Sequence, residues 1–130
     1  HLFSMLKDHA ERGHTIVLVT ETIHPLAMPF RRAFGARAVF DTTLETAVRH
    51  GKRCYTGAIS CLCYHEKKAE LVQQFAKRAG IDLAASYGYG DSAHDAPFLK
   101  LVGHPVAVHP DHELARIAAE RGWSVMDRKR

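Results

Sequence analysis

Two aspartates, Asp91 and Asp95, lie in the segment YGYGDSAHDAP. The surrounding pattern places them where a strand ends and a short helix begins. Two carboxylates this close in a tight turn, without adjacent basic side chains, suit a hard cation such as Mg²⁺, which prefers oxygen ligands. The glycines of the segment allow close approach of the backbone, and Ser92 adds a hydroxyl group. The segment therefore predicts a metal-binding or catalytic use for the two carboxylates.

Helix capping is the alternative explanation for Asp95, because Ser92 and Asp95 have the spacing of a capping box. Pro97 lacks an N–H group and fits best in the first turn of a helix, which moves the expected helix start to about His94 or Asp95. Asp95 would then be a cap itself, and the capping box would be weakened. Asp91 would have no structural explanation in either case.

Two further residues are predicted near the carboxyl ends of strands, where open α/β sheets bind ligands. Thr20 ends the predicted strand TIVLVT, and Lys68 begins the helix that precedes the strand of Asp91. Each has a structural explanation, because β-branched residues are common in strands and a helix-terminal lysine is usually solvated. However, a cation at a helix N-terminus is mildly unfavourable. The position of Lys68 therefore hints at another use, such as neutralising a phosphate.

Cys61, Cys63 and His65 alternate along a predicted strand and would share one face, where soft ligands could hold zinc. A fourth ligand at the usual spacing is missing, because Cys54 lies across the predicted hairpin. The residues therefore favour reduced structural thiols over a zinc site. Three cysteines without framework spacing are typical of a cytoplasmic protein.

Strands and helices are expected to alternate along the chain. The patterns predict helices at 2–12, 25–34, 68–79, 96–102 and 110–121, strands at 15–20, 37–40, 85–91, 104–109 and 123–126, and a hairpin that turns at His50-Gly51-Lys52. Such alternation predicts an α/β fold with an open, mostly parallel sheet.

The composition limits the classes of partner. With 130 residues, 46% of them hydrophobic, the chain has the size of one soluble domain. Its longest apolar run, Ile16 to Val19, is far shorter than the roughly 20 residues of a membrane-spanning helix. The net charge of +4 favours an anionic substrate. The basic residues are scattered and lack interleaved aromatics, so nucleic-acid binding is not expected.

Taken in order, these motifs resemble the haloacid-dehalogenase superfamily, and within it the phosphoserine-phosphatase-like branch. The segment IVLVT resembles the second motif of the family, and EKKAELVQQFAKRAGIDL resembles the third. The segment GDSAHDAPFLKLVGHPVAVHPDHELARIAAERGW resembles the fourth motif with the run beyond it, and this match is highly specific. The resemblance implies that residues 1–130 form a partial, three-layer Rossmann-like core domain with a β-hairpin and no second domain.

The resemblance also implies a Mg²⁺-dependent phosphomonoester hydrolase that works through an aspartyl-phosphate on a small phosphorylated substrate. Thr20 would hydrogen-bond the phosphate and Lys68 would neutralise it. Asp91 would ligate Mg²⁺, and Asp95 would ligate the ion or orient it through water.

Two details of this assignment concern neighbouring residues. Ser92 is a further candidate for substrate binding. Lys67 competes with Lys68 for the role of the motif lysine, and the register of the helix that follows favours Lys68.

The chain departs from the family pattern in its first motif, because no Asp-x-Asp occurs in the sequence. The segment FDTT at Asp41 follows the second strand and cannot replace it. We therefore expect the nucleophile and the cap upstream of His1, and the chain as given to be inactive. Loss of that central strand should leave unpaired strand edges. Glu21 also departs from the branch, since a small residue more often follows the motif threonine.

Two further possibilities follow from these departures. The branch also contains domains fused to acyltransferases, which allows further domains in the full-length protein. A non-catalytic remnant that binds a metal or phosphate, or acts as an interaction module, is the alternative function.

Overall fold

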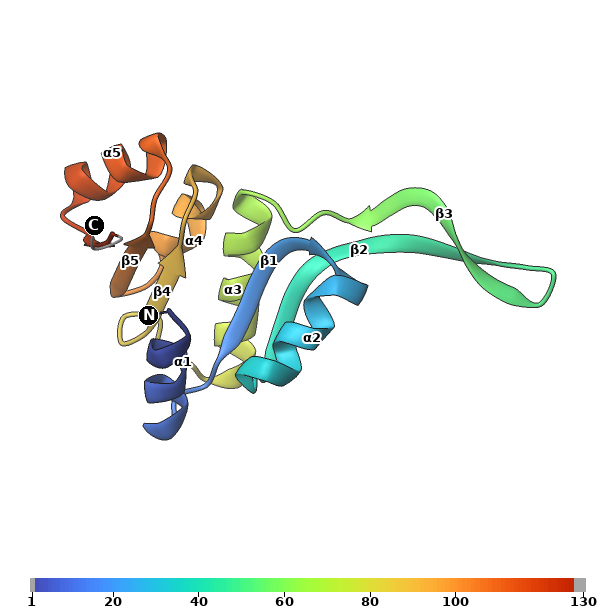
Figure 1. Cartoon of the computed structure of the whole chain (residues 1–130), viewed down its shortest axis with the longest axis horizontal. Coiled ribbons are helices and arrows are strands. Elements are labelled where there is room, and N and C mark those ends of the chain that lie inside the picture. Colours follow the sequence, from blue (N-terminus) through green and yellow to red (C-terminus); the bar gives the residue numbers. More distant parts are fainter. Residues whose placement is uncertain (1, 128–130) are drawn as a thin grey trace. The chain divides into compact units, whose positions relative to one another are not determined.

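The computed structural model of the chain describes residues 2–127 (Figure 1). The chain divides into two compact units, His1–Tyr64 and His65–Arg130, and each is described by itself below. Helices and strands alternate in both units, which confirms the predicted α/β class. The interpretation of the chain as one partial core domain stays a prediction.

The first unit combines two helices with a three-stranded sheet. Its elements are α1 (Leu2–Glu11), β1 (Val17–Ile23), α2 (His24–Phe34), β2 (Ala38–Arg49) and β3 (Lys52–Cys61). The strand order is β1-β2-β3, with β1 parallel and β3 antiparallel to β2. Glycine ends α2 as predicted: Gly35 adopts a left-handed conformation, and its N–H group is directed at carbonyls of the last turn.

The long hairpin of this unit differs from the prediction in one respect. The predicted short strand 37–40 and the first hairpin strand are a single strand, β2, which runs for 12 residues. The turn is at His50 and Gly51, as predicted, and both residues have positive φ angles of 51° and 73°. Positive φ at both central residues matches the right-handed twist of the two strands. The hairpin extends the sheet beyond β1 (Figure 1), with irregular pairing between Thr43 and Thr46.

The strand that carries Thr20 is longer than the sequence suggested. Thr20 was expected to end it, but β1 continues to Ile23. The regular parallel register with β2 stops at Val19 and resumes only at Ile23. The hydroxyl of Thr20 accepts a hydrogen bond from the N–H of Thr22, at 3.1 Å. Thr20 therefore lies at the irregularity that follows the regular ladder, rather than at the end of the strand.

The second unit is a parallel three-stranded sheet with helices. Its elements are α3 (Glu66–Ala79), β4 (Tyr87–Gly90), the 3₁₀ helix η1 (Ala93–Asp95), α4 (Ala96–Leu99), β5 (His104–Val108), α5 (His112–Arg121) and β6 (Ser124–Met126). The strand order is β4-β5-β6, and both pairs are parallel. The core of the unit consists of apolar residues from α4, β5 and α5, namely Ala96, Phe98, Leu99, Ala107, Leu114 and Ala118.

Two helix boundaries in this unit correct the sequence prediction. The helix expected at 96–102 ends early, at Leu99, and a 3₁₀ turn (Ala93–Asp95) precedes it. Pro110 was expected to open the last helix, but Asp111 is its N-cap and α5 begins at His112. The reason is that the Asp111 carboxylate accepts the N–H of Leu114 at 2.7 Å, which is the preferred way to satisfy a first-turn amide.

The strands form two three-stranded sheets rather than the single sheet expected. Among the described residues, β1 pairs only with β2 and β4 only with β5. In the described residues, β1 and β3 are therefore the edge strands of the first sheet, and β4 and β6 those of the second. Over residues 2–127, no helix is both long enough and apolar enough to cross a membrane.

Candidate active site

A buried ion pair joins the start of α3 to the turn after β4. The ammonium nitrogen of Lys68 lies 2.7 Å from Oδ1 of Asp95, and the two side chains are only 5% and 10% exposed. Burying a charge costs on the order of several kcal/mol per ion. A buried pair offsets this cost only when the two charges are close and their remaining groups are hydrogen-bonded. Because little water is available to replace either partner, Lys68 and Asp95 are held in this one arrangement.

The second carboxylate oxygen of Asp95 organises the turn itself. Oδ2 accepts the N–H of Asp91 at 3.1 Å and is 3.5 Å from the amide nitrogen of Ser92. A capping box between Ser92 and Asp95 is formed at the start of η1. The expectation that Pro97 weakens this box is wrong, because the box spans η1 and Pro97 lies in the first turn of the next helix, α4. Asp95 is also the N-cap residue of α4, as expected. Asp95 thus caps the turn and pairs with Lys68 at once.

Gly90 is required by the close approach of Asp95. A Cβ atom at position 90 would lie 2.6 Å from the Cβ of Asp95 and 2.8 Å from its Oδ2. Real Cβ atoms do not approach other atoms this closely, so any side chain would displace the carboxylate. The glycine was predicted to allow close approach to the backbone, and the group that approaches it is the side chain of Asp95.

Asp91 differs from Asp95 in its surroundings. Its backbone is fixed, because its N–H donates to Asp95 and its carbonyl accepts the N–H of Asp111 at 2.8 Å. The residue is exposed. In the described part of the chain its carboxylate takes part in none of the hydrogen bonds or ion pairs. The turn thus holds one carboxylate in an ion pair and presents the other to solvent.

Asp111 is a residue of this region that the sequence analysis missed. Its Oδ1 caps α5 through Leu114, and its Oδ2 accepts the N–H of Ala93 at 3.0 Å. These amide hydrogen bonds, that of Leu114 first, hold the pKa of Asp111 below its usual value. The aspartate just before an apolar helical pattern was the available signal. Asp111 fixes the first residue of η1 and so the turn that carries Asp95.

The two candidate lysines differ in their surroundings. Lys67 lies at the surface, where its ammonium group is 3.0 Å from Glu70 one turn along α3. Lys68 is buried against Asp95. Of these two lysines, only Lys68 reaches the turn after β4; its role as the motif lysine stays a prediction.

Two histidine rings, from His65 before α3 and His94 in η1, are in contact. The rings of His65 and His94 lie 4.6 Å apart. His65 precedes α3 with a positive φ angle of 42°, a conformation that is rare for residues other than glycine. This ring contact links the residue that precedes α3 to η1, the two segments that carry Lys68 and Asp95.

The predicted site residues fall into two groups. Lys68, Asp91, Ser92 and Asp95 all belong to the unit His65–Arg130, where the structure brings them together. Thr20 belongs to the unit His1–Tyr64. A shared site that includes Thr20 stays a prediction.

The three cysteines are free thiols. Cys63 is buried, and its sulfur lies 3.5 Å from the carbonyl oxygen of Phe40, which its S–H can reach as a donor. Among residues 2–127, no group of three or more His, Cys, Asp or Glu side chains is arranged to hold a metal. In particular, Cys61, Cys63 and His65 do not form a three-ligand group.

Comparison with known proteins gives relatives for nearly the whole chain. A protein of Streptomyces azureus named for inhibition of morphological differentiation is 35% identical over 95% of this chain and 44% of its own length. A phosphoserine phosphatase of Mycobacterium tuberculosis is 34% identical over 92% of this chain and 38% of its own length. The chain thus spans about four tenths of the length of these curated relatives.

A solved structure shows the same fold. A substrate-bound phosphoserine phosphatase is 22% identical and covers 98% of this chain and 57% of its own, with a TM-score of 0.76. At this identity the likeness concerns the Rossmann-like fold alone. The model of the haloacid dehalogenase-like hydrolase family matches residues 1–100. The motif order, the fold and this match lead to one conclusion: the chain belongs to the haloacid dehalogenase-like hydrolase family.

Proposed function

We propose that the protein is a Mg²⁺-dependent phosphomonoester hydrolase, and that this chain supplies all of its core motifs except the nucleophile. The observation that carries the proposal is the buried Lys68–Asp95 pair beside the exposed carboxylate of Asp91. A fixed cation next to an available carboxylate is an arrangement that can hold a phosphate and its metal ion.

Asp91 and Asp95 are not equally suited to bind Mg²⁺ directly. Asp91 is exposed and its backbone is fixed at both ends, so its carboxylate suits direct ligation of a hard cation. Asp95 already uses Oδ1 for Lys68 and Oδ2 for amides of the turn. Asp95 is therefore better suited to orienting the metal through water. When bound, the ion would neutralise charge on the phosphoryl oxygens.

The remaining roles follow from charge and position. Lys68 would stabilise the phosphoryl group and the nucleophile, and its pairing with Asp95 fixes its ammonium group in advance. Thr20 would donate its hydroxyl proton to a phosphate oxygen, while the hydroxyl oxygen keeps the hydrogen bond from Thr22. Ser92 is a further candidate for substrate binding through its hydroxyl. Catalysis in such a site is mainly positioning and charge stabilisation.

The nucleophile is proposed to come from an Asp-x-Asp strand upstream of His1. Its first carboxylate would form a bond to phosphorus as the ester P–O bond breaks, and the second Asp would protonate the leaving oxygen. Hydrolysis of the acyl phosphate by water would restore the carboxylate. The unpaired edges of β1 and β4 support the proposal, because such edges can accept another strand.

The substrate is proposed to be a small phosphorylated molecule in the cytoplasm. The net charge of +4 favours an anion, and one relative is named a phosphoserine phosphatase. The non-catalytic remnant is not favoured, since the chain keeps Thr20, Lys68, Asp91 and Asp95. Further domains in the full-length protein are compatible with the longer relatives.

The test is hydrolysis of p-nitrophenyl phosphate by the protein with its upstream segment, with Mg²⁺ and with the metal removed by EDTA. We expect turnover only with Mg²⁺, and none from the chain 1–130 alone. Asp91→Asn should lower kcat at least about 100-fold, the scale on which loss of one charge-stabilising group acts.

Lys67→Met and Lys68→Met form a matched pair, because the two lysines are adjacent on α3 and only Lys68 is buried. Lys68→Met should abolish turnover and Lys67→Met should retain it. Turnover that survives Asp91→Asn or is insensitive to EDTA would contradict the proposal, as would an upstream reading frame without Asp-x-Asp.

A further inference from the structure

The hairpin formed by β2 and β3 exposes an apolar face. The antiparallel register pairs Thr46 with Tyr55 and Val48 with Arg53. Alternate residues of a strand share one face, and so do directly paired residues. Val48 and Tyr55 therefore lie on the same face of the hairpin, where their side chains are 67% and 60% exposed. Ile59 pairs with Leu44 beyond an irregularity in the register and is 54% exposed.

The outer part of the hairpin, residues 46–55, is called the tip below. It carries only positive charge: Arg49, Lys52 and Arg53 with His50 at the turn. From Thr42 to Cys61 the only acidic residue is Glu45, and its carboxylate accepts a hydrogen bond from the Thr56 hydroxyl at 2.6 Å. The cations are thus neutralised by no acid within the tip.

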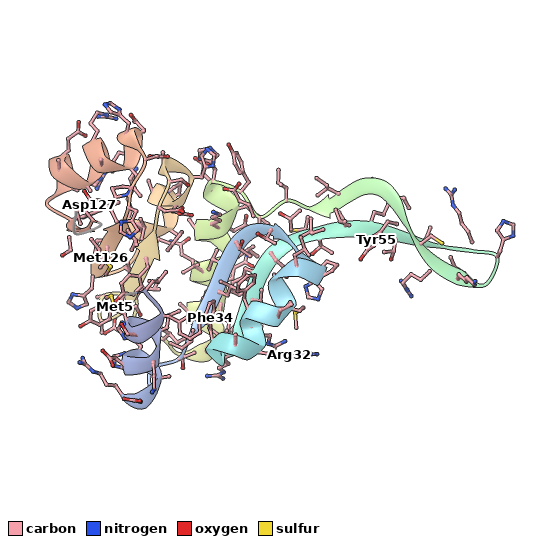
Figure 2. The ribbon with its side chains drawn as sticks, in the orientation of Figure 1. Met5, Arg32, Phe34, Tyr55, Met126 and Asp127 are labelled. Carbon is pink, nitrogen blue, oxygen red and sulfur yellow. The ribbon has the colours of Figure 1, made fainter. Side chains whose placement is uncertain are left out.

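Within its unit the tip has no cover. Figure 1 shows β2 and β3 continuing beyond β1 and α2, and Figure 2 labels Tyr55 on this outer part of the hairpin. Every residue from Val48 to Tyr55 is exposed. Adjacent apolar side chains exposed to water mark surfaces that bind a partner. The adjoining cations indicate that this partner is negatively charged.

We propose that the tip docks the protein onto an anionic phospholipid bilayer. The register puts Arg53 on the face of Val48, and Arg49 with Lys52 on the opposite face. The tip would therefore enter the headgroup layer turn-first, so that all three cations lie within a Debye length of the surface, where each contributes to attraction. Val48 would enter the boundary of the acyl chains. Tyr55 is an amphipathic ring of the kind that concentrates at membrane–water interfaces. The tip would therefore supply both the electrostatic attraction and the apolar contact of interfacial binding.

Two other partners fit the tip less well. Single-stranded nucleic acid would require several stacking aromatics, and Tyr55 is the only aromatic of the tip apart from the ring of His50. A second copy of the chain could cover the apolar face, but the contact would also cover Arg53, which shares that face, and the tip offers it no acidic partner. An anionic bilayer is the partner for which apolar area and charge both act favourably.

The test is sedimentation of the whole chain with vesicles of phosphatidylcholine alone or with 30% phosphatidylglycerol. We expect binding to the anionic vesicles only, weakening as salt is raised. Arg49→Gln with Lys52→Gln should weaken binding about 30-fold, at about fivefold for each cation. Val48→Thr with Tyr55→Thr keeps strand-forming residues and should leave a weaker binding that high salt removes entirely.

Lys77→Gln with Arg78→Gln is the matched control, because it removes the same two charges from exposed positions on α3. It should bind like the parent. Equal binding to both vesicle types, equal loss in the control, or no vesicle binding would overturn the proposal. So would tip-dependent binding to oligonucleotides in preference to vesicles, or a dimer in sedimentation velocity that the Val48/Tyr55 variant dissociates.

Discussion

The turn after β4 and the tip of the β2–β3 hairpin use similar residue types in opposite surroundings. In the turn, Lys68 and Asp95 are buried in contact, and a glycine leaves room for the carboxylate. In the tip, Arg49, Lys52 and Arg53 are exposed beside Val48 and Tyr55. The difference is desolvation: a charge that has lost its water depends on one partner, whereas an exposed charge has water as a substitute.

This comparison predicts where substitutions are costly. In the turn, removing one group leaves another buried without a partner, so the loss exceeds the strength of the contact itself. In the tip, the same kind of removal leaves only solvated groups. Stability should therefore depend on the turn, and surface binding on the tip.

The largest effect is expected for Lys68→Ala. It leaves the Asp95 carboxylate buried without its cation, which should lower the free energy of unfolding by about 3–5 kcal/mol. Urea unfolding followed by circular dichroism measures the change. Lys67→Ala, which removes only a surface contact with Glu70, should change it by no more than about 1 kcal/mol. Equal losses in the two variants would remove the distinction between the buried and exposed lysine.

Gly90→Ala should come next, with a loss of about 1–3 kcal/mol typical of overpacking. The new Cβ would lie 2.6 Å from the Cβ of Asp95 and would push the carboxylate away from Lys68. Gly51→Ala in the hairpin turn is the comparison, since open space surrounds that position and only its positive φ of 73° opposes a side chain. It should cost about 1 kcal/mol. A smaller loss at Gly90 than at Gly51 would contradict the packing described for the turn.

Asp111→Ala should lower stability by about 1 kcal/mol, as loss of an N-cap does. Hydrogen bonds from Leu114 and Ala93 lower the pKa of Asp111 below 3.8 in the folded protein. Its contribution is therefore complete above about pH 4 and is lost as pH falls through the lower, folded pKa. Urea titrations at pH 7 and at pH 3 should show a parent–variant difference that shrinks at pH 3. A difference that grows on acidification would reverse the assigned sign.

The smallest effect is expected for Val48→Thr in the tip. The side chain is 67% exposed, and threonine keeps the branched shape that suits a strand. The free energy of unfolding should change by no more than about 0.5 kcal/mol. A loss above about 1 kcal/mol in the same urea titration would show that Val48 is packed against a part of the protein and is not available to a surface.

Much of the fold could be predicted because its signals are local. Glycine after α2, α3 and α5 adopts the left-handed conformation that ends a helix. The hairpin turn was recognisable from His50 and Gly51. The start of α5 was missed although its signal, Asp111, is local. The 3₁₀ turn before α4, in contrast, depends on a contact that is remote in sequence. The N–H of Ala93, for example, is bonded to Asp111, 18 residues away, and no local pattern contains that information.

The sequence by itself determined the order of motifs and the identity of Asp91, Asp95 and Lys68 as candidates, because residue type and spacing set which chemistry is available. Only the tertiary structure decided how the candidates differ. It buried Lys68 rather than Lys67, gave Asp95 both a capping and an ion-pairing role, and left Asp91 exposed. The physical reason is that burial depends on the elements packed around a side chain, and desolvation then determines which charges must be paired.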